Sequence, residues 1–165
     1  MRRLALPLAA FVGLCIAGCG GSSPHIKDAG CHAAGVQHLR YDCQDPVRTM
    51  VNGKSCSARA SSHPSTEQPI YGSDGNEVAT LEVVTSQTCQ YAAWPRVKGI
   101  DKGNTQKVVV VIARTHPANQ AYYEGTAEGT GVVYGGMINS RDYCVTAEAT
   151  VGSSKIARTR YCLGS

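Results

Sequence analysis

The sequence lacks a large excess of charge of either sign, and this narrows the classes of partner. Its formal net charge is +4. Arg2 and Arg3 lie in a leader segment described below, which leaves 14 basic residues against 12 acidic ones. A strongly basic nucleic-acid-binding domain is therefore excluded on charge. Charged residues make up only 17% of the chain and hydrophobic ones 42%, which excludes general disorder.

The sequence also lacks the short motifs of common enzymes. The phosphate-binding motifs G-x-x-x-x-G-K-[ST] and G-x-G-x-x-G are absent. The G-x-S-x-G and H-E-x-x-H patterns of hydrolases are absent as well. The sequence contains no C-x-x-C motif, which would indicate redox chemistry or a zinc site. The histidines are scattered along the chain at His25, His32, His38, His63 and His116. We therefore expect no catalytic residues, no metal and no cofactor. The alternative is an enzyme whose catalytic residues are recognised only by their geometry.

The first hydrophobic run, Leu4 to Ile16, has 13 residues. That is too short for a membrane-spanning helix, which needs roughly 20 residues, but it suits a signal peptide behind Arg2 and Arg3. The following Ile16-Ala17-Gly18-Cys19 resembles the lipobox of bacterial lipoproteins. The resemblance implies a signal peptide over residues 1–18, acyl chains such as palmitate at Cys19, and a lipid anchor on the extracytoplasmic face of the cell membrane. Ordinary secretion and twin-arginine export are the alternatives.

Two regions follow the leader. Residues 19–30 are rich in Gly and Ser, which is typical of a flexible tether. Residues 31–165 are predicted to form one all-β domain, a small barrel or sandwich of six to eight strands with little helix. Strands are indicated over Glu77 to Ser86 and Lys107 to Thr115, which are rich in β-branched residues.

The stretch from Glu124 to Ile138 is expected to contain a strand or two with a bend. Tyr91 to Val97 is expected to make at most one short turn because it contains Pro95. Ser61 to Glu77 is expected to be a long surface loop, where recognition often lies.

The clearest hairpin lies between Asp142 and Cys162, with a turn at Gly152-Ser153-Ser154. A register centred on Ser153 places Cys144 opposite Cys162 and Glu148 opposite Arg158. The same register puts the alternate apolar residues Val145, Ala147, Ala149 and Val151 on the core face.

An even number of cysteines remains once Cys15 leaves with the leader and Cys19 takes lipid. In an exported domain these six predict three disulfides, with 15 possible connectivities. The hairpin favours Cys144–Cys162, a short local loop favours Cys31–Cys43, and Cys56–Cys89 is then left. The expected disulfide cysteines are Cys31, Cys43, Cys56, Cys89, Cys144 and Cys162.

Several short elements in the middle of the chain form a pattern. They are Cys43-Gln44-Asp45-Pro46, Gly53-Lys54-Ser55-Cys56, Leu81-Glu82-Val83, the run from Cys89 to Arg96, and Met137 shortly after Tyr134. The pattern resembles a family of small exported actinobacterial proteins, known only as a domain of unknown function, which carries a Cys-x-Ala-x-Trp-x-Arg element. The resemblance implies export and disulfides, and it supplies no reaction.

Aromatic residues supply the candidate binding positions. Trp94, the only tryptophan, stands near Tyr91 and Arg96, a composition common at binding hot spots. The alternative is that Trp94 packs on a disulfide in the core. Tyr122 and Tyr123 are adjacent on a strand, so one is expected to be buried and the other available to a ligand.

We expect a non-catalytic binding or structural module of the cell envelope. Its partners are then the membrane, through the anchor, and a cell-wall polymer or another exported protein, with no nucleic acid. Arg158 and Arg160, two residues apart on one strand, offer a small basic patch for an anionic polymer. The alternative function is an inhibitor of an exported protease or lysozyme.

Overall fold

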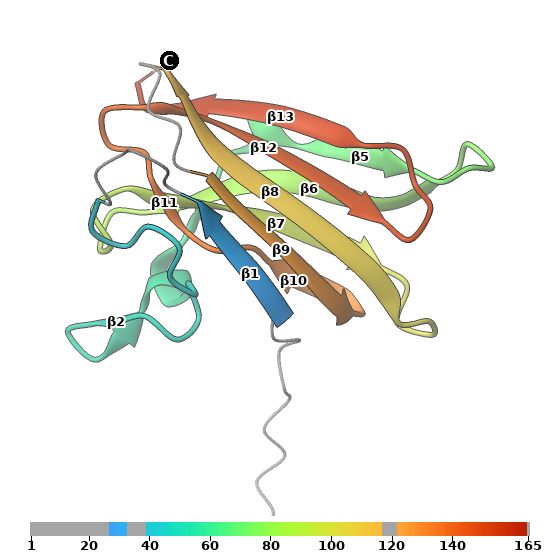
Figure 1. Ribbon diagram of the computed structural model, residues 1–165, viewed down its shortest axis with the longest axis horizontal. Coiled ribbons are helices and arrows are strands. Elements are labelled where there is room, and N and C mark those ends of the chain that lie inside the picture. The colour runs from blue at the N-terminus through green and yellow to red at the C-terminus, as the bar shows by residue number, and fades with distance from the viewer. Residues whose placement is uncertain (1–26, 33–38, 117–121, 165) are drawn as a thin grey trace, which may run out of the picture.

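The protein is an all-β sandwich, as predicted (Figure 1). The computed structural model describes residues 27–32, 39–116 and 122–164, and it describes side chains for all of these except 27–32, His116 and Tyr122. Two antiparallel sheets lie face to face with the core between them. Within the described ranges, no helix is long and apolar enough to cross a membrane.

The larger sheet has the strand order β1-β9-β8-β12-β13, and the second has β10-β7-β6-β4, with β5 also paired to β6 and β11 to β7. A separate hairpin is formed by β2 and β3. The strands are β1 (Lys27–His32), β2 (Met50–Val51), β3 (Lys54–Ser55), β4 (Ser61–Ser62), β5 (Gln68–Tyr71), β6 (Glu77–Ser86), β7 (Ala92–Ile100), β8 (Gln106–His116), β9 (Tyr122–Gly129), β10 (Gly131–Tyr134), β11 (Ile138–Asn139), β12 (Cys144–Val151) and β13 (Ala157–Cys162).

The described strands outnumber the six to eight expected, because several have only two residues. Residues 61–77, expected as a long loop, are mostly ordered along β6. They form β4, the 3-10 turn η2 (Pro64–Thr66) and β5 before a turn leads into β6. Between β4 and β5, the Thr66 hydroxyl accepts a hydrogen bond from the backbone N–H of Val83 at 2.9 Å, which fills the gap in the ladder.

The main core is built by strand alternation. On β8, Val108, Val110 and Ile112 are buried, whereas the intervening Val109 and Val111 are partly exposed on the outer face. Each fully buried Val or Ile contributes roughly 1.5–3 kcal/mol relative to an exposed one. A run of consecutive β-branched residues therefore folds as a strand with one face in the sandwich.

The C-terminal hairpin has the predicted register. Cys144 pairs with Cys162 and Glu148 with Arg158 across β12 and β13. Cys144 and Cys162 form a disulfide, and the Arg158 Nε donates to Glu148 Oε1 at 2.7 Å. The alternate residues from Val145 to Val151 are buried, as predicted.

The turn expected over Tyr91 to Val97 is wrong, because β7 begins at Ala92 and runs through Pro95. The Pro95 carbonyl accepts a hydrogen bond from Gly135 N on the side where β10 ends and β11 has not begun. The N–H and C=O of one strand residue point to the same side, so the missing Pro95 N–H falls at this gap and costs no ladder bond. A Cβ on Gly135 would lie 2.5 Å from Pro95 Cγ, so only glycine fits beside the ring.

A second core lies on the outer face of β6 and β7, under residues 39–60, here called the covering segment. It contains Val84 and Trp94 from the sheet, Tyr41 and Cys56 from the covering segment, and Cys89 from the turn before β7, together with Ala92 and Met137. The predicted Cys56–Cys89 disulfide is present and crosses this core.

The covering segment is also held by a buried ion pair with β8. The Arg114 Nη1 donates to Asp42 Oδ1 at 3.0 Å, and Nη2 lies 2.9 Å from Oδ2. Asp42 accepts backbone hydrogen bonds from Asn139 and Leu39 as well. Cys43 is disulfide-bonded. Because the Cys31 side chain lies outside the described residues, the Cys31–Cys43 pairing stays a prediction.

Candidate functional site

Trp94, a candidate binding residue, is fully buried in the second core. It pairs with Val84 across β6 and β7 and packs in the cluster that contains Cys56 and Cys89. The packing interpretation of Trp94 therefore holds, and its side chain is not available to a ligand at the surface. Trp94 is buried because the covering segment packs over the outer face of β7 at this position.

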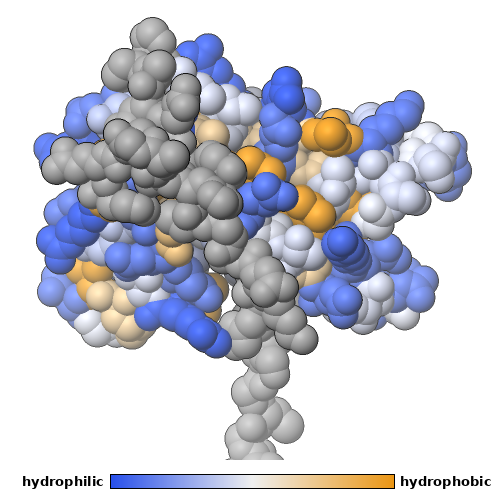
Figure 2. Space-filling view, viewed as in Figure 1, coloured by the Kyte–Doolittle hydropathy of each residue, from blue (hydrophilic) through white to orange (hydrophobic). Residues whose placement is uncertain are grey.

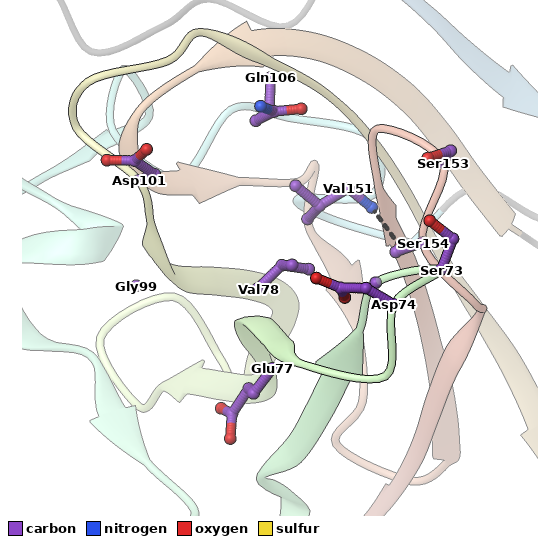
Figure 3. A pocket seen from close by; sticks show the side chains of 11 residues that line it. Ser73, Asp74, Glu77, Val78, Gly99, Asp101, Gln106, Val151, Ser153 and Ser154 are labelled. Carbon is purple, nitrogen blue, oxygen red and sulfur yellow. Dashed lines mark hydrogen bonds between the residues drawn. The ribbon is translucent and has the colours of Figure 1, made fainter.

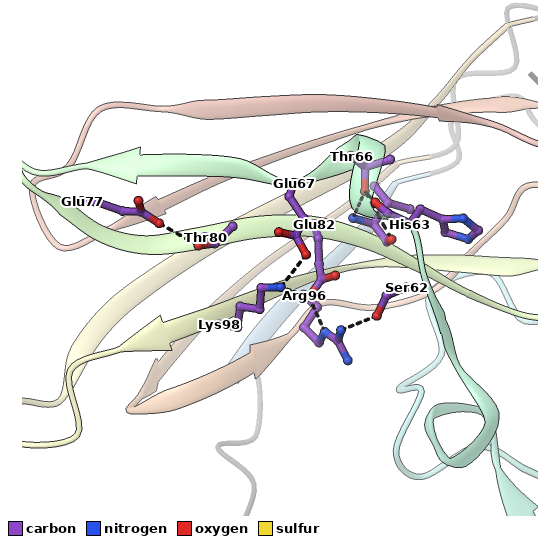
Figure 4. A network of polar contacts seen from close by, with 10 residues as sticks. Ser62, His63, Thr66, Glu67, Glu77, Thr80, Glu82, Arg96 and Lys98 are labelled. Atoms are coloured by element: carbon purple, nitrogen blue, oxygen red, sulfur yellow. Dashed lines mark hydrogen bonds and ion pairs between the residues drawn. The ribbon is translucent and has the colours of Figure 1, made fainter.

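Arg96, two residues further on the same face, belongs to a polar network (Figure 4). Its Nε donates to Glu82 Oε1 at 2.7 Å and its Nη2 to Ser62 Oγ at 2.6 Å. The hydrogen bond to Glu82 raises the pKa of Arg96. Lys98 joins the network, donating to Glu67 at 2.6 Å and lying 3.5 Å from Glu82 Oε1.

Glu82 is 0% exposed, so this network has a structural purpose. A buried carboxylate is costly unless cations and hydrogen bonds compensate it. Arg96 and Lys98 compensate it from the solvent side, with side chains 24% and 36% exposed. The two cations are balanced by Glu82 and Glu67, so this face offers a ligand little net charge.

The remaining aromatic candidates are spread over the molecule. Tyr91 is half-buried and has a positive φ of 59° in the turn before β7, where its carbonyl accepts a hydrogen bond from Ser140. Tyr123 is buried in the main core, as expected for one of the two adjacent tyrosines. Burial raises its pKa to about 12. The Tyr122 side chain lies outside the described residues. The candidates with described side chains do not converge on one ligand site.

Among the histidines, only the side chain of His63 lies in the described part of the chain. Its Nε2 is 2.8 Å from Thr85 Oγ1, and its ring centroid is 4.2 Å from that of Tyr161. Burial lowers its pKa. Within the described residues, no group of three or more His, Cys, Asp or Glu side chains is placed to hold a metal ion.

A cavity of about 440 Å³ lies at the end of the sandwich where three turns meet (Figure 3). We call it the turn-end cavity. The β5–β6 turn supplies Asp74, the β7–β8 turn supplies Asp101, and the β12–β13 turn supplies Ser153 and Ser154. The cavity is hollowed between hairpins that are distant in the sequence, so no local motif announces it.

The turns that form this cavity are fixed by their own side chains. Asp74 accepts hydrogen bonds from the Asn76 backbone at 3.0 Å and from its amide at 2.9 Å, and these lower the pKa of Asp74. Asp101 accepts from Gly103 N at 2.9 Å. The Ser154 hydroxyl accepts from Val151 N at 2.8 Å. The walls are therefore preorganised before any ligand binds.

The lining combines acceptors and a small apolar part. Glu77 joins Asp74 and Asp101, while Val78 and Val151 supply apolar surface near the middle of the view. None of the described lining residues is Lys or Arg, and three of them carry carboxylates, so the lining itself is acidic. A carboxylate has about four acceptor sites, which suits a ligand that donates hydrogen bonds from hydroxyl or ammonium groups.

The outer face of the larger sheet carries the predicted Arg158 and Arg160 pair, both exposed. Figure 2 shows apolar surface on this face in small patches separated by hydrophilic residues. Val109, Val111 and the 64% exposed Ile156 line a hollow of only about 90 Å³. Glu148 pairs with Arg158, as the predicted register indicated, and this lowers the net positive charge of the basic patch.

Comparison with known proteins adds no relative: no family model, curated protein or solved structure matches this chain. The resemblance to the actinobacterial family stays a prediction. The candidate site therefore depends on geometry alone, and the turn-end cavity is a concave, preorganised feature of the described residues. Sequence reasoning missed Asp74, Glu77 and Asp101, although acidic residues near Gly and Asn at two turns were the available signal.

Proposed function

We propose that this protein is a lipid-anchored, non-catalytic binding module on the extracytoplasmic face of the cell membrane, and that its ligand binds in the turn-end cavity. The observation that carries the proposal is the cavity itself: about 440 Å³, lined by fixed hydrogen-bonding groups on a disulfide-stapled sandwich. That volume lies within the range of small-molecule sites, roughly 300–1,000 Å³.

The chemistry of the lining selects the class of ligand. Carboxylates and hydroxyls accept hydrogen bonds from sugar hydroxyls and from ammonium groups, and Val78 and Val151 offer apolar contact to a ring or an alkyl chain. A cell-wall polymer that carries sugars and amino groups has these features. The disulfides support an exported location, since such bonds persist in oxidising compartments.

Binding is tested with isolated cell wall and the full chain. Changing Asp74→Asn, Glu77→Gln and Asp101→Asn together keeps the size of the lining but removes its charge, and we expect binding to fall at least tenfold. The matched control is Glu124→Gln with Glu128→Gln, which removes exposed carboxylates from the outer face of β9. Equal binding by the cavity variant and the wild type would show that the ligand does not use the cavity.

The anchor is tested separately. Mass spectrometry of the mature protein should find residue 19 at the N-terminus with a diacylglycerol on its sulfur, and Cys19→Ala should release the protein into the medium. A Cys19→Ala variant that stays in the membrane fraction contradicts the anchor.

Inhibition of an exported hydrolase is the second candidate function. The observation that favours it is the turn 73–76, which is exposed, projects from the sandwich between β5 and β6 (Figure 1) and is held by Asp74 and Asn76. A rigid projecting turn resists proteolysis and can occupy an enzyme cleft. Nanomolar inhibition of a secreted protease or lysozyme, abolished by replacing this turn, would favour inhibition over wall binding.

A further inference from the structure

The covering segment ends in a hairpin that exposes several cationic side chains and one large apolar side chain. We call Arg48, Met50, Lys54 and Arg59 the basic hairpin; they lie on and beside β2, β3 and the 3-10 turn η1 (Cys56–Arg59). The Arg48 side chain is 65% exposed and Met50 is 58% exposed, while Lys54 and Arg59 are also exposed. A large apolar side chain is thus presented to solvent near the cations Lys54 and Arg59, while Arg48 lies 3.8 Å from the Asp45 carboxylate.

The geometry of this hairpin is well defined. Asn52 and Gly53 have φ values of 50° and 74°, and the positive values at both positions are those of a tight type I′ turn. The adjoining Cys56 is fixed to Cys89 by the disulfide. The hairpin therefore projects from a rigid base, as Figure 1 shows for β2.

A hollow of about 330 Å³ lies against the hairpin, lined by Val51, Asn52, Lys54, Arg59 and Thr88. It brings two cations, from β3 and from η1, to one concavity together with the hydroxyl of Thr88 and the amide of Asn52. Cations and neutral donors around a small concavity suit a phosphate group. No described acidic residue lines the hollow.

The side from which the hairpin projects is also the side where β1 begins (Figure 1). Only seven residues lie between Cys19 and Lys27, and an extended chain over these eight Cα–Cα steps spans at most about 28 Å. A lipid at Cys19 would therefore keep this side of the domain near the bilayer. In Figure 2 the corner where β2 lies carries hydrophobic surface bordered by hydrophilic residues.

We propose that the basic hairpin binds anionic phospholipid headgroups of the membrane that holds the anchor. Lys54 and Arg59 contact a lipid phosphate in the hollow, and Met50 enters the interfacial layer. The inference rests on the proposed lipidation of Cys19. An acyl anchor and a cationic surface reinforce each other on anionic membranes, and together they fix the orientation of the domain.

The test uses the acylated full mature protein carrying Met50→Trp, reconstituted in vesicles with brominated phospholipids. Bromine quenches only a tryptophan that reaches the acyl region, and the native Trp94 is fully buried. We expect quenching in vesicles of phosphatidylglycerol with phosphatidylcholine to be several-fold greater than in phosphatidylcholine alone, and to fall as salt rises.

Charge reversal of Arg48, Lys54 and Arg59 to Glu should abolish this quenching. The matched control reverses three exposed lysines elsewhere, Lys102, Lys107 and Lys155, and should leave it unchanged. Equal quenching in both lipids, or equal loss in both triple variants, would overturn the proposal. Loss of wall binding in the hairpin variant without any vesicle quenching would overturn it in favour of an anionic wall polymer.

The two proposals fail in distinguishable ways. If the mature protein lacks the mass of the lipid, the proposed anchor is wrong, and the hairpin inference, which rests on the anchor, is wrong with it. If the acylated protein floats with anionic vesicles but the tryptophan at position 50 is not quenched, only the hairpin inference is contradicted.

Discussion

The two cores of this molecule are specified in different ways. The main core lies between two sheets and is filled by alternate residues of long strands such as β6, β8 and β12. The second core lies outside one sheet, under a covering segment whose only strands, β2 and β3, have two residues each. Local alternation organises the first, whereas the second depends on cross-links between distant residues, the Cys56–Cys89 disulfide and the Asp42–Arg114 pair.

The largest expected effect comes from breaking that ion pair. Arg114→Met leaves the Asp42 carboxylate buried beside an apolar side chain, which should cost about 3–5 kcal/mol of unfolding free energy. Urea denaturation measures it. The double variant Asp42→Asn with Arg114→Met should be less damaging than Arg114→Met alone, because no charge is then left unpaired. A loss below 1 kcal/mol in Arg114→Met would show that the pair does not secure the covering segment.

Removing the Cys56–Cys89 disulfide should come next. The bridge closes a loop with a sequence separation of 33, for which chain entropy gives roughly 3–4 kcal/mol. Replacing both cysteines by Ala should expose the covering segment to proteases before the sandwich unfolds. The matched variant replaces Cys144 and Cys162. Their disulfide has a sequence separation of 18 and links two strands that are already paired. If both variants are cleaved at the same sites and rates, the two cores are not independent.

Alkaline pH should weaken the main core. The pKa of Tyr123 is raised to about 12 mainly by burial, so the folded state holds a proton that the unfolded state releases near pH 10. Stability is then complete below pH 10 and falls as pH rises toward 12, by roughly 1–3 kcal/mol. Thermal unfolding across this range measures the loss. Tyr123→Phe should flatten most of the dependence, leaving a part from Tyr161, whose pKa burial also raises.

The smallest effect on stability is expected from the exposed ion pair of the β12–β13 hairpin. The Arg158–Glu148 pair is short, at 2.7 Å, but the Arg158 side chain is 68% exposed. Exposed ion pairs contribute about 0–1 kcal/mol, so Arg158→Ala should change the denaturation midpoint little and less still at high salt. A loss above 2 kcal/mol would mean that this pair holds the strand register.

The sequence predicted those parts of the fold that depend on nearby residues. The register of β12 and β13 followed from one turn, two cysteines and one charge pair, and it was confirmed. Strand β7 was missed because Pro95 normally argues against a strand, and its tolerance depends on the gap between β10 and β11. The buried Glu82 was equally hidden, since Arg96 and Lys98 reach it only once β6 and β7 pair.

The candidate site was less predictable than the fold. Asp74, Asp101 and Ser154 lie on three turns that meet only when the two sheets stack. Trp94 was a candidate binding residue because it is the only tryptophan and stands near Arg96, yet the covering segment buries it. Composition indicates which residues can bind, but which of them remain accessible is decided by long-range packing.

Strand β13 ends its sheet, and an open edge of this kind is a template on which a neighbouring chain can add a strand. Its exposed Arg158 and Arg160 alternate with buried Thr159, and its last residue is bonded to β12. An incoming identical strand would bring arginines against arginines, on an edge that cannot fray to accept it. This edge is thereby protected against pairing with a second copy of itself.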